Sequence, residues 1–127
     1  MKTLTLCEAR WKNPIVLAFV GDTVYDLFVR TSIVADSAAG IQAVHKKAVH
    51  LVNAHAQARA AEALEPLFTE AETEVYRRGR NAKSAVPKNM TVADYRKATG
   101  LEAVIGYLWL VGETDRLEAL FEVILRA

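Results

Sequence analysis

Ile15-Val16-Leu17-Ala18-Phe19-Val20-Gly21-Asp22 is an apolar run that ends in a glycine and an acid. A second run, Leu101-Glu102-Ala103-Val104-Ile105-Gly106, also places an acid among apolar residues. We expect each run to lie on a helix and to bury its carboxylate. Because a buried carboxylate without a partner is costly, it is normally neutralised, paired or bound to a metal ion. Asp22 and Glu102 therefore indicate a metal site.

The composition is that of one folded domain, over residues 1–127, with an apolar core. At 52% hydrophobic residues the chain is too apolar to be disordered. Its single cysteine, Cys7, excludes an internal disulfide and a cysteine cluster for zinc. The first ten residues lack the apolar core of a signal peptide, and no apolar run approaches the roughly 20 residues of a membrane span. We expect a soluble, cytoplasmic protein without a membrane partner.

Helix signals recur along the chain, whereas strand signals are almost absent. Asn13 can cap a helix that has Pro14 in its first turn, and Thr69 with Glu72 has the spacing of a capping box. The pattern predicts an all-α fold with about five main helices. They cover residues 14 to about 30, 41–64, 69 to about 79, 91 to about 111, and 113–125, with a loop over residues 80–89.

The first of these helices is apolar on two sides. Its most apolar face is predicted to contain Leu17, Val20, Val24, Leu27 and Phe28. The opposite stripe, which carries the acids, is also largely apolar. Such a helix is either central to its domain or covered by a partner subunit, so the pattern favours a homodimer.

The acids have a spacing and surroundings that suit a cation. Asp26 follows Asp22 by one helical turn, and like charges at that spacing repel each other. Carboxylate oxygens and water suit Mg²⁺, with Mn²⁺ as an alternative. Small residues nearby would allow the two helices to approach closely: Ala18, Gly21, Ala98 and Gly106. Other interpretations stay open: Asp22 pairs with Lys or Arg, Glu102 is structural, and Asp26 is solvated or ion-paired.

A basic segment between the two acids points to a polyanion. Residues 77–97 hold seven basic residues and one acid, although the net charge of the whole chain is only +1. Glycine, asparagine, serine and proline alternate with the cations, so backbone and side-chain groups can both reach phosphates. The alternative is an ordinary solvated surface. The candidate RNA-binding residues are His45, Lys46, Lys47, Arg77, Arg78, Arg80, Asn81, Lys83, Ser84 and Lys88.

These segments resemble the ribonuclease III family. Residues 17–26, Leu-Ala-Phe-Val-Gly-Asp-Thr-Val-Tyr-Asp, resemble its signature helix, and residues 101–108 resemble its second acidic motif. Residues 45–49, His-Lys-Lys-Ala-Val, and 77–84, Arg-Arg-Gly-Arg-Asn-Ala-Lys-Ser, are closer to one branch, the Mini-III ribonucleases. The resemblance covers the chain from about Pro14 to Leu125.

The resemblance implies an all-helical ribonuclease III endonuclease domain without a separate double-stranded-RNA-binding domain. Such a domain forms a homodimer and cleaves double-stranded RNA with Mg²⁺, leaving 5′-phosphate and 3′-hydroxyl ends. The branch implies maturation of the large-subunit (23S) ribosomal RNA precursor. Asp22 and Glu102 match the family's principal catalytic, metal-binding carboxylates.

Two departures from the family pattern leave the number of metal ions open. Ordinary ribonuclease III has a glutamate where Ala18 stands and an aspartate where Thr99 stands, and both acids normally lie near the metal. Two other functions are therefore considered. One is a non-catalytic RNA-binding or ribosome-associated module with the same fold. The other is a metal-dependent nucleotide phosphohydrolase, which leaves the basic loop unexplained.

Overall fold

The computed structural model describes residues 1–126, and within them the chain is all-α. The helices are α1 (Leu6–Arg10), α2 (Pro14–Asp36), α3 (Ile41–Val52), α4 (Ala54–Leu64), α5 (Glu70–Asn81), α6 (Val92–Leu110) and α7 (Thr114–Arg126), with a 3₁₀ turn, η1 (Glu65–Leu67), after α4. The predicted all-α class is thereby confirmed. No helix in residues 1–126 is both long and apolar enough to cross a membrane.

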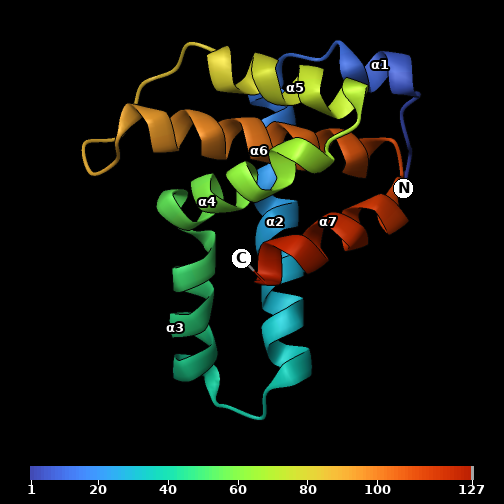
Figure 1. Cartoon of the computed structure of the whole chain (residues 1–127). Coiled ribbons are helices and arrows are strands. Elements are labelled where there is room, and N and C mark those ends of the chain that lie inside the picture. Colours follow the sequence, from blue (N-terminus) through green and yellow to red (C-terminus); the bar gives the residue numbers. More distant parts are fainter. Residues whose placement is uncertain (127) are drawn as a thin grey trace.

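Helix α6 is the centre of the fold. Its residues from Ala98 to Leu108 are buried with the exception of Glu102, which is partly exposed. Figure 1 shows α6 lying across the molecule beneath α5, with α2 crossing it and α4 alongside. A helix apolar all round must be covered on several sides, which explains why α2, α4 and α5 all pack against it.

Helices α2 and α6 cross with their backbones in contact. A Cβ atom built on Gly21 would lie 1.7 Å from the carbonyl oxygen of Glu102, and one on Gly106 would lie 1.9 Å from that of Leu17. No side chain fits in either place. The predicted close approach at Gly21 and Gly106 is therefore confirmed, and it brings the two acidic runs together.

Several predicted helix ends are wrong. Helix α2 continues to Asp36, six residues beyond the expected end. The expected helix over residues 41–64 is two helices, because Asn53 is extended and caps α4 through a hydrogen bond from the Ala56 N–H to its side chain. Helix α5 passes Gly79, which serves close packing against Gly100 rather than chain reversal. The short helix α1, opened by a Thr5–Glu8 capping box, was not predicted.

The exposed side of α2 also differs from the prediction. Leu27 is exposed although it was assigned to the main apolar face, whereas Tyr25, which lies on the side of the helix that carries the acids, is buried. The core side of α2 consists of Leu17, Ala18, Gly21, Val24, Tyr25, Val29 and Ile33. An apolar strip faces outward instead, formed by Val16, Phe19, Leu27 and Val34.

Candidate active site

Asp22 and Glu102 lie in one open groove between α2, α4 and the N-terminal half of α6. The groove has a volume of about 490 Å³. Its lining residues are Ile15, Ala18, Phe19, Asp22, Val52, Asn53, Ala54, Gln57, Met90, Tyr95, Ala98, Thr99 and Glu102. The two acidic runs, residues 15–22 and 101–106, which were linked by their chemistry in the sequence, therefore lie next to each other in the structure.

The helix crossing determines where these two acids stand. Gly21 precedes Asp22, and the backbone of Glu102 is the group that Gly21 contacts. Each carboxylate thus extends from the point where the two helices are closest. The packing of α2 against α6 therefore fixes the backbone positions from which the two carboxylates extend.

The expectation that both acids are buried is only half right. Asp22 is exposed on the open side of the groove, and Glu102 is partly buried. Asp22 lies at the mouth because its position on α2 turns it away from the buried core side. The alternative in which Asp22 pairs with Lys or Arg is not realised among residues 1–126, since neither residue type lines the groove.

The electrostatics of the groove favour a positive ion. Burial is the largest of the causes that raise the pKa of Glu102 to about 9; a hydrogen-bonding contact with Asp22 and the charge of Asp22 act in the same direction, and a hydrogen bond with Gln57 opposes them. Two carboxylates without a cation repel each other and hold a proton that a divalent ion would displace.

The donor set fits Mg²⁺ better than zinc. No group of three or more His, Cys, Asp or Glu side chains that could hold a metal occurs within the described part of the chain. Mg²⁺ commonly takes one or two protein carboxylates and keeps its remaining positions for water and substrate phosphate. Asp22 and Glu102 in an open groove match that pattern.

The two positions that depart from the ribonuclease III pattern lie in this groove. Ala18 and Thr99 both line it, so the missing acids would have stood beside the pair that remains. The Thr99 hydroxyl donates a hydrogen bond of 2.9 Å to the Tyr95 carbonyl within α6. Asp26 does not replace them, because it forms an ion pair of 3.0 Å with Arg30. Its ion-paired interpretation is confirmed.

The predicted basic residues divide into structural and exposed groups. Arg78 donates hydrogen bonds of 2.6 and 3.2 Å to the carbonyls of Arg10 and Lys12, and its guanidinium stacks on Trp11. Arg78 therefore has a structural role, which is to hold the N-terminal segment in place. Arg80 lies partly buried over the ring of Tyr76. The exposed members of this segment are Arg77, Asn81, Lys83, Ser84 and Lys88.

The second basic cluster, His45-Lys46-Lys47, is exposed on α3. Figure 1 shows α3 below α4, whereas the loop of residues 82–91 extends above it. The segments that carry the two clusters therefore lie on opposite sides of α4. Contact of these residues with RNA stays a prediction.

Two residues that line the groove were not named as candidate site residues from the sequence. Gln57 is a buried polar residue of α4, and Tyr95 accepts a 3.1 Å hydrogen bond from Ser84 in the basic loop. Gln57 is the one polar residue on the buried side of α4, where its neighbours are alanine and leucine, and that exception to the apolar pattern was the available signal. Tyr95 precedes Glu102 by seven residues, so its place on the same side of the helix followed from the spacing, whereas its bond with Ser84 had no signal because Ser84 lies in a loop of irregular structure.

Comparison with known proteins agrees with this geometry. The family description "Ribonuclease III domain" matches residues 15–113. A protein of Thermoanaerobacter sp. (strain X514) named Mini-ribonuclease 3 is 46% identical over 87% of this chain and 79% of its own length. A Clostridium tetani protein of the same name is 42% identical over 93% of this chain and 80% of its own.

The fold has a close match among solved structures. A crystal structure of a Fusobacterium nucleatum protein superimposes with a TM-score of 0.84 and 26% sequence identity, covering 92% of this chain and 94% of that protein. The ribonuclease III family acts on RNA and is generally metal-dependent. The chain belongs to the ribonuclease III family, in its Mini-ribonuclease 3 branch, and is an endoribonuclease.

Proposed function

We propose that the chain cleaves double-stranded RNA with Mg²⁺ held by Asp22 and Glu102, as a homodimer. The observation that carries the proposal is the carboxylate pair in an open groove whose lining has no Lys or Arg. The 23S ribosomal RNA precursor is the proposed substrate, and the cytoplasm the proposed place of action. Cleavage would leave 5′-phosphate and 3′-hydroxyl ends.

The roles of the two acids follow from their surroundings. Asp22, exposed at the mouth of the groove, would hold the ion together with Glu102. Glu102, deeper in the groove, must give up its proton to become a ligand. When bound, Mg²⁺ or Mn²⁺ lowers the pKa of its own water and stabilises charge on the phosphate that is attacked. The groove, which Ala18 and Thr99 also line, has a volume of about 490 Å³ and therefore has room for water beside the two acids.

The proposed RNA surface consists of the exposed members of the two basic clusters. Duplex RNA is read mainly through its shape, its phosphates and its 2′-hydroxyls, which requires cations spread over a surface. Lys83 and Lys88 are exposed in the loop, and Lys46 and Lys47 are exposed on α3. Figure 1 shows this loop and α3 on opposite sides of α4. A duplex held by both clusters would pass over α4, which lies between them.

The apolar strip of α2 supports the homodimer. Phe19 is 78% exposed and Val16 is 51% exposed, which is unfavourable for a chain that stays single in water. Val16, Leu27 and Val34 lie nearly in line along the helix, and Phe19 lies beside them. Because Phe19 also lines the groove, a partner seated on this strip would lie next to the site.

A cleavage assay tests the proposal. Duplex RNAs and matched single strands are incubated with the purified protein, with Mg²⁺ or with EDTA, and the ends of the products are mapped. We expect cleavage of duplexes in Mg²⁺ alone. Binding without cleavage would indicate the non-catalytic RNA-binding module, and turnover of free nucleotides that duplex RNA does not inhibit would indicate the phosphohydrolase.

A further inference from the structure

Gln57 is a buried polar side chain whose position in the fold needs a reason. The buried polar side chains recorded in residues 1–126 are Gln57, Glu72 and Thr99. Glu72 is paired with Arg116 at 2.8 Å, and Thr99 donates to a carbonyl of its own helix. Gln57 is 5% exposed and belongs to the groove lining. A buried amide without a partner is unfavourable, so its partner matters.

The partner is the carboxylate of Glu102. Gln57, on α4, lines the same groove as Glu102, and its side-chain amide is in hydrogen-bonding contact with this carboxylate. Gln57 is also one of the few polar side chains that are buried among residues 1–126. It is therefore placed to orient the Glu102 carboxylate from the wall of the groove.

Asn53, the other side-chain amide that lines the groove, does not support Glu102 in this way. The Asn53 side chain accepts from the Ala56 N–H at 2.9 Å and donates to the carbonyls of Val49 and His50 at 3.1 and 2.9 Å. These bonds satisfy the break between α3 and α4. Asn53 is thus occupied by the backbone, whereas Gln57 is directed to the site.

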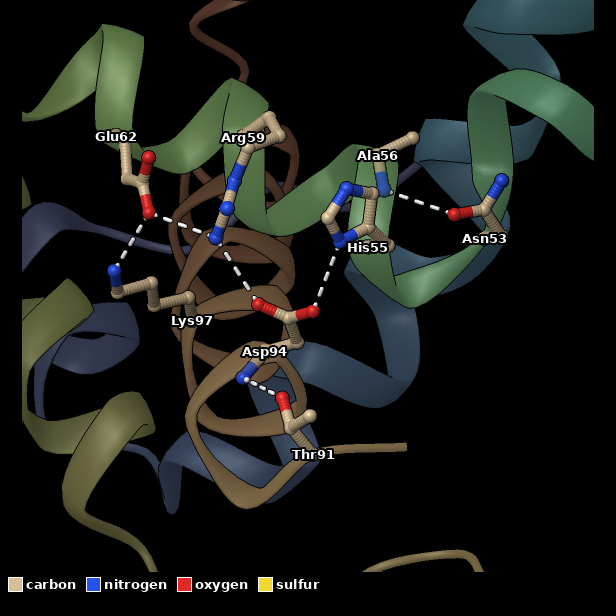
Figure 2. A network of polar contacts seen from close by, with 8 residues as sticks. All are labelled: Asn53, His55, Ala56, Arg59, Glu62, Thr91, Asp94 and Lys97. Atoms are coloured by element: carbon tan, nitrogen blue, oxygen red, sulfur yellow. Dashed lines mark hydrogen bonds and ion pairs between the residues drawn. The ribbon is translucent and has the colours of Figure 1, made fainter. Parts of the chain in front are cut away.

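A polar network holds α4 in register with α6. Figure 2 shows Asp94 of α6 between two residues of α4, with 3.0 Å to the Arg59 guanidinium and 3.0 Å to Nδ1 of His55. Glu62 contacts both Arg59 at 2.8 Å and Lys97 of α6 at 2.7 Å. These contacts lie before and after Gln57 along α4. They therefore fix the position of Gln57 on α4 relative to Glu102 on α6.

We propose that Gln57 is a positioning residue, which holds the Glu102 carboxylate in the orientation needed for binding the metal ion. The proposal rests on the proposed function of the groove. Residues that orient metal ligands through hydrogen bonds typically change metal affinity about 10–100-fold when they are removed. Gln57 contributes to that affinity without contacting the ion or the RNA.

The test replaces the amide by an apolar group of similar size. Gln57→Met removes the donor, and Gln42→Met makes the same change at an exposed glutamine of α3 as the matched control. Binding of Mn²⁺ alone is measured by electron paramagnetic resonance on RNA-free protein. We expect about a tenfold or greater weakening in Gln57→Met and none in Gln42→Met. Duplex cleavage should need more metal for half-saturation, with the KM for RNA unchanged.

A second variant keeps the proposal testable if Gln57→Met does not fold. Gln57→Asn keeps the amide but is one methylene shorter, so it should remain folded and still weaken Mn²⁺ binding. Unchanged Mn²⁺ affinity in a folded Gln57 variant would overturn the positioning role, even if the melting temperature fell. A wild-type protein that neither binds Mn²⁺ nor cleaves duplex RNA would instead overturn the proposed function itself.

Discussion

Gly21→Ala is the substitution that tests most sharply how the site is built. The new Cβ would stand 1.7 Å from the Glu102 carbonyl oxygen and 2.9 Å from the Gly106 nitrogen. Non-bonded carbon and oxygen atoms need about 3.3 Å, so α2 and α6 must separate by roughly 1.5 Å. The atoms that the methyl group meets belong to helix backbones and cannot turn aside.

Two opposing energies decide the outcome of Gly21→Ala. Alanine stabilises a helix interior by about 1 kcal/mol relative to glycine, whereas forcing atoms into a packed core costs about 1–3 kcal/mol or more. The contact here is far shorter than in ordinary overpacking, so we expect net destabilisation of about 2 kcal/mol. Because roughly 1 Å of misplacement in a site can cost about a hundredfold in rate, cleavage should fall at least that much.

The assay pairs thermal unfolding, followed by circular dichroism, with single-turnover cleavage of a duplex RNA. Gly40→Ala is the control, because a Cβ on Gly40 has no atom within 4 Å. Gly21→Ala should melt several degrees lower and cleave poorly, while Gly40→Ala stays close to wild type. A Gly21→Ala protein with wild-type melting and cleavage would refute the backbone contact between α2 and α6.

Three further predictions concern charge and assembly. In metal-free protein the native state keeps a proton on Glu102 over a pH range in which the unfolded state has released it, so the contribution of Glu102 to stability is largest below pH 4.5 and declines towards pH 9. Glu102→Gln should flatten this part of the pH dependence in unfolding titrations and raise stability at pH 8, and an unchanged slope would contradict the prediction. Arg78→Ala should lower the melting temperature with little change in the salt dependence of RNA binding. Lys88→Ala should leave the melting temperature unchanged and reduce the salt slope of RNA binding by about 1. The reverse pattern would show that the structural role of Arg78 and the RNA-binding role of Lys88 are misassigned. Phe19→Asp should convert a dimer to a monomer in analytical ultracentrifugation, and a dimer that persists would rule out the α2 strip as the interface.

Features set by local chemistry were predictable from the sequence. The caps at Asn13 and Thr69 start helices where expected, because a cap depends on residues within one turn. The pairing of Asp22 with Glu102 was also predictable, since the glycines that permit it lie in the same runs. Asp22 and Glu102 were therefore identified from their sequence motifs and from the expected close packing of the two helices.

Features set by contacts distant in sequence were not predictable. Arg78 and Lys88 are both cations of one basic segment, yet only Arg78 meets the carbonyls of the N-terminal segment. The break at Asn53 was missed for a different reason: its bonds to Val49, His50 and Ala56 are local, but the alanine-rich run after it has no proline or glycine and favours one continuous helix. The exposure of Asp22 depends on which side of α2 faces α6.

The central claim is that Asp22 and Glu102 together perform metal-dependent cleavage of duplex RNA. The most direct measurement is single-turnover cleavage of a labelled duplex by Asp22→Asn in Mg²⁺, with binding of the same duplex measured in parallel. The account predicts that the variant folds and binds RNA like the wild type but forms no product. A fully active Asp22→Asn protein would contradict the account.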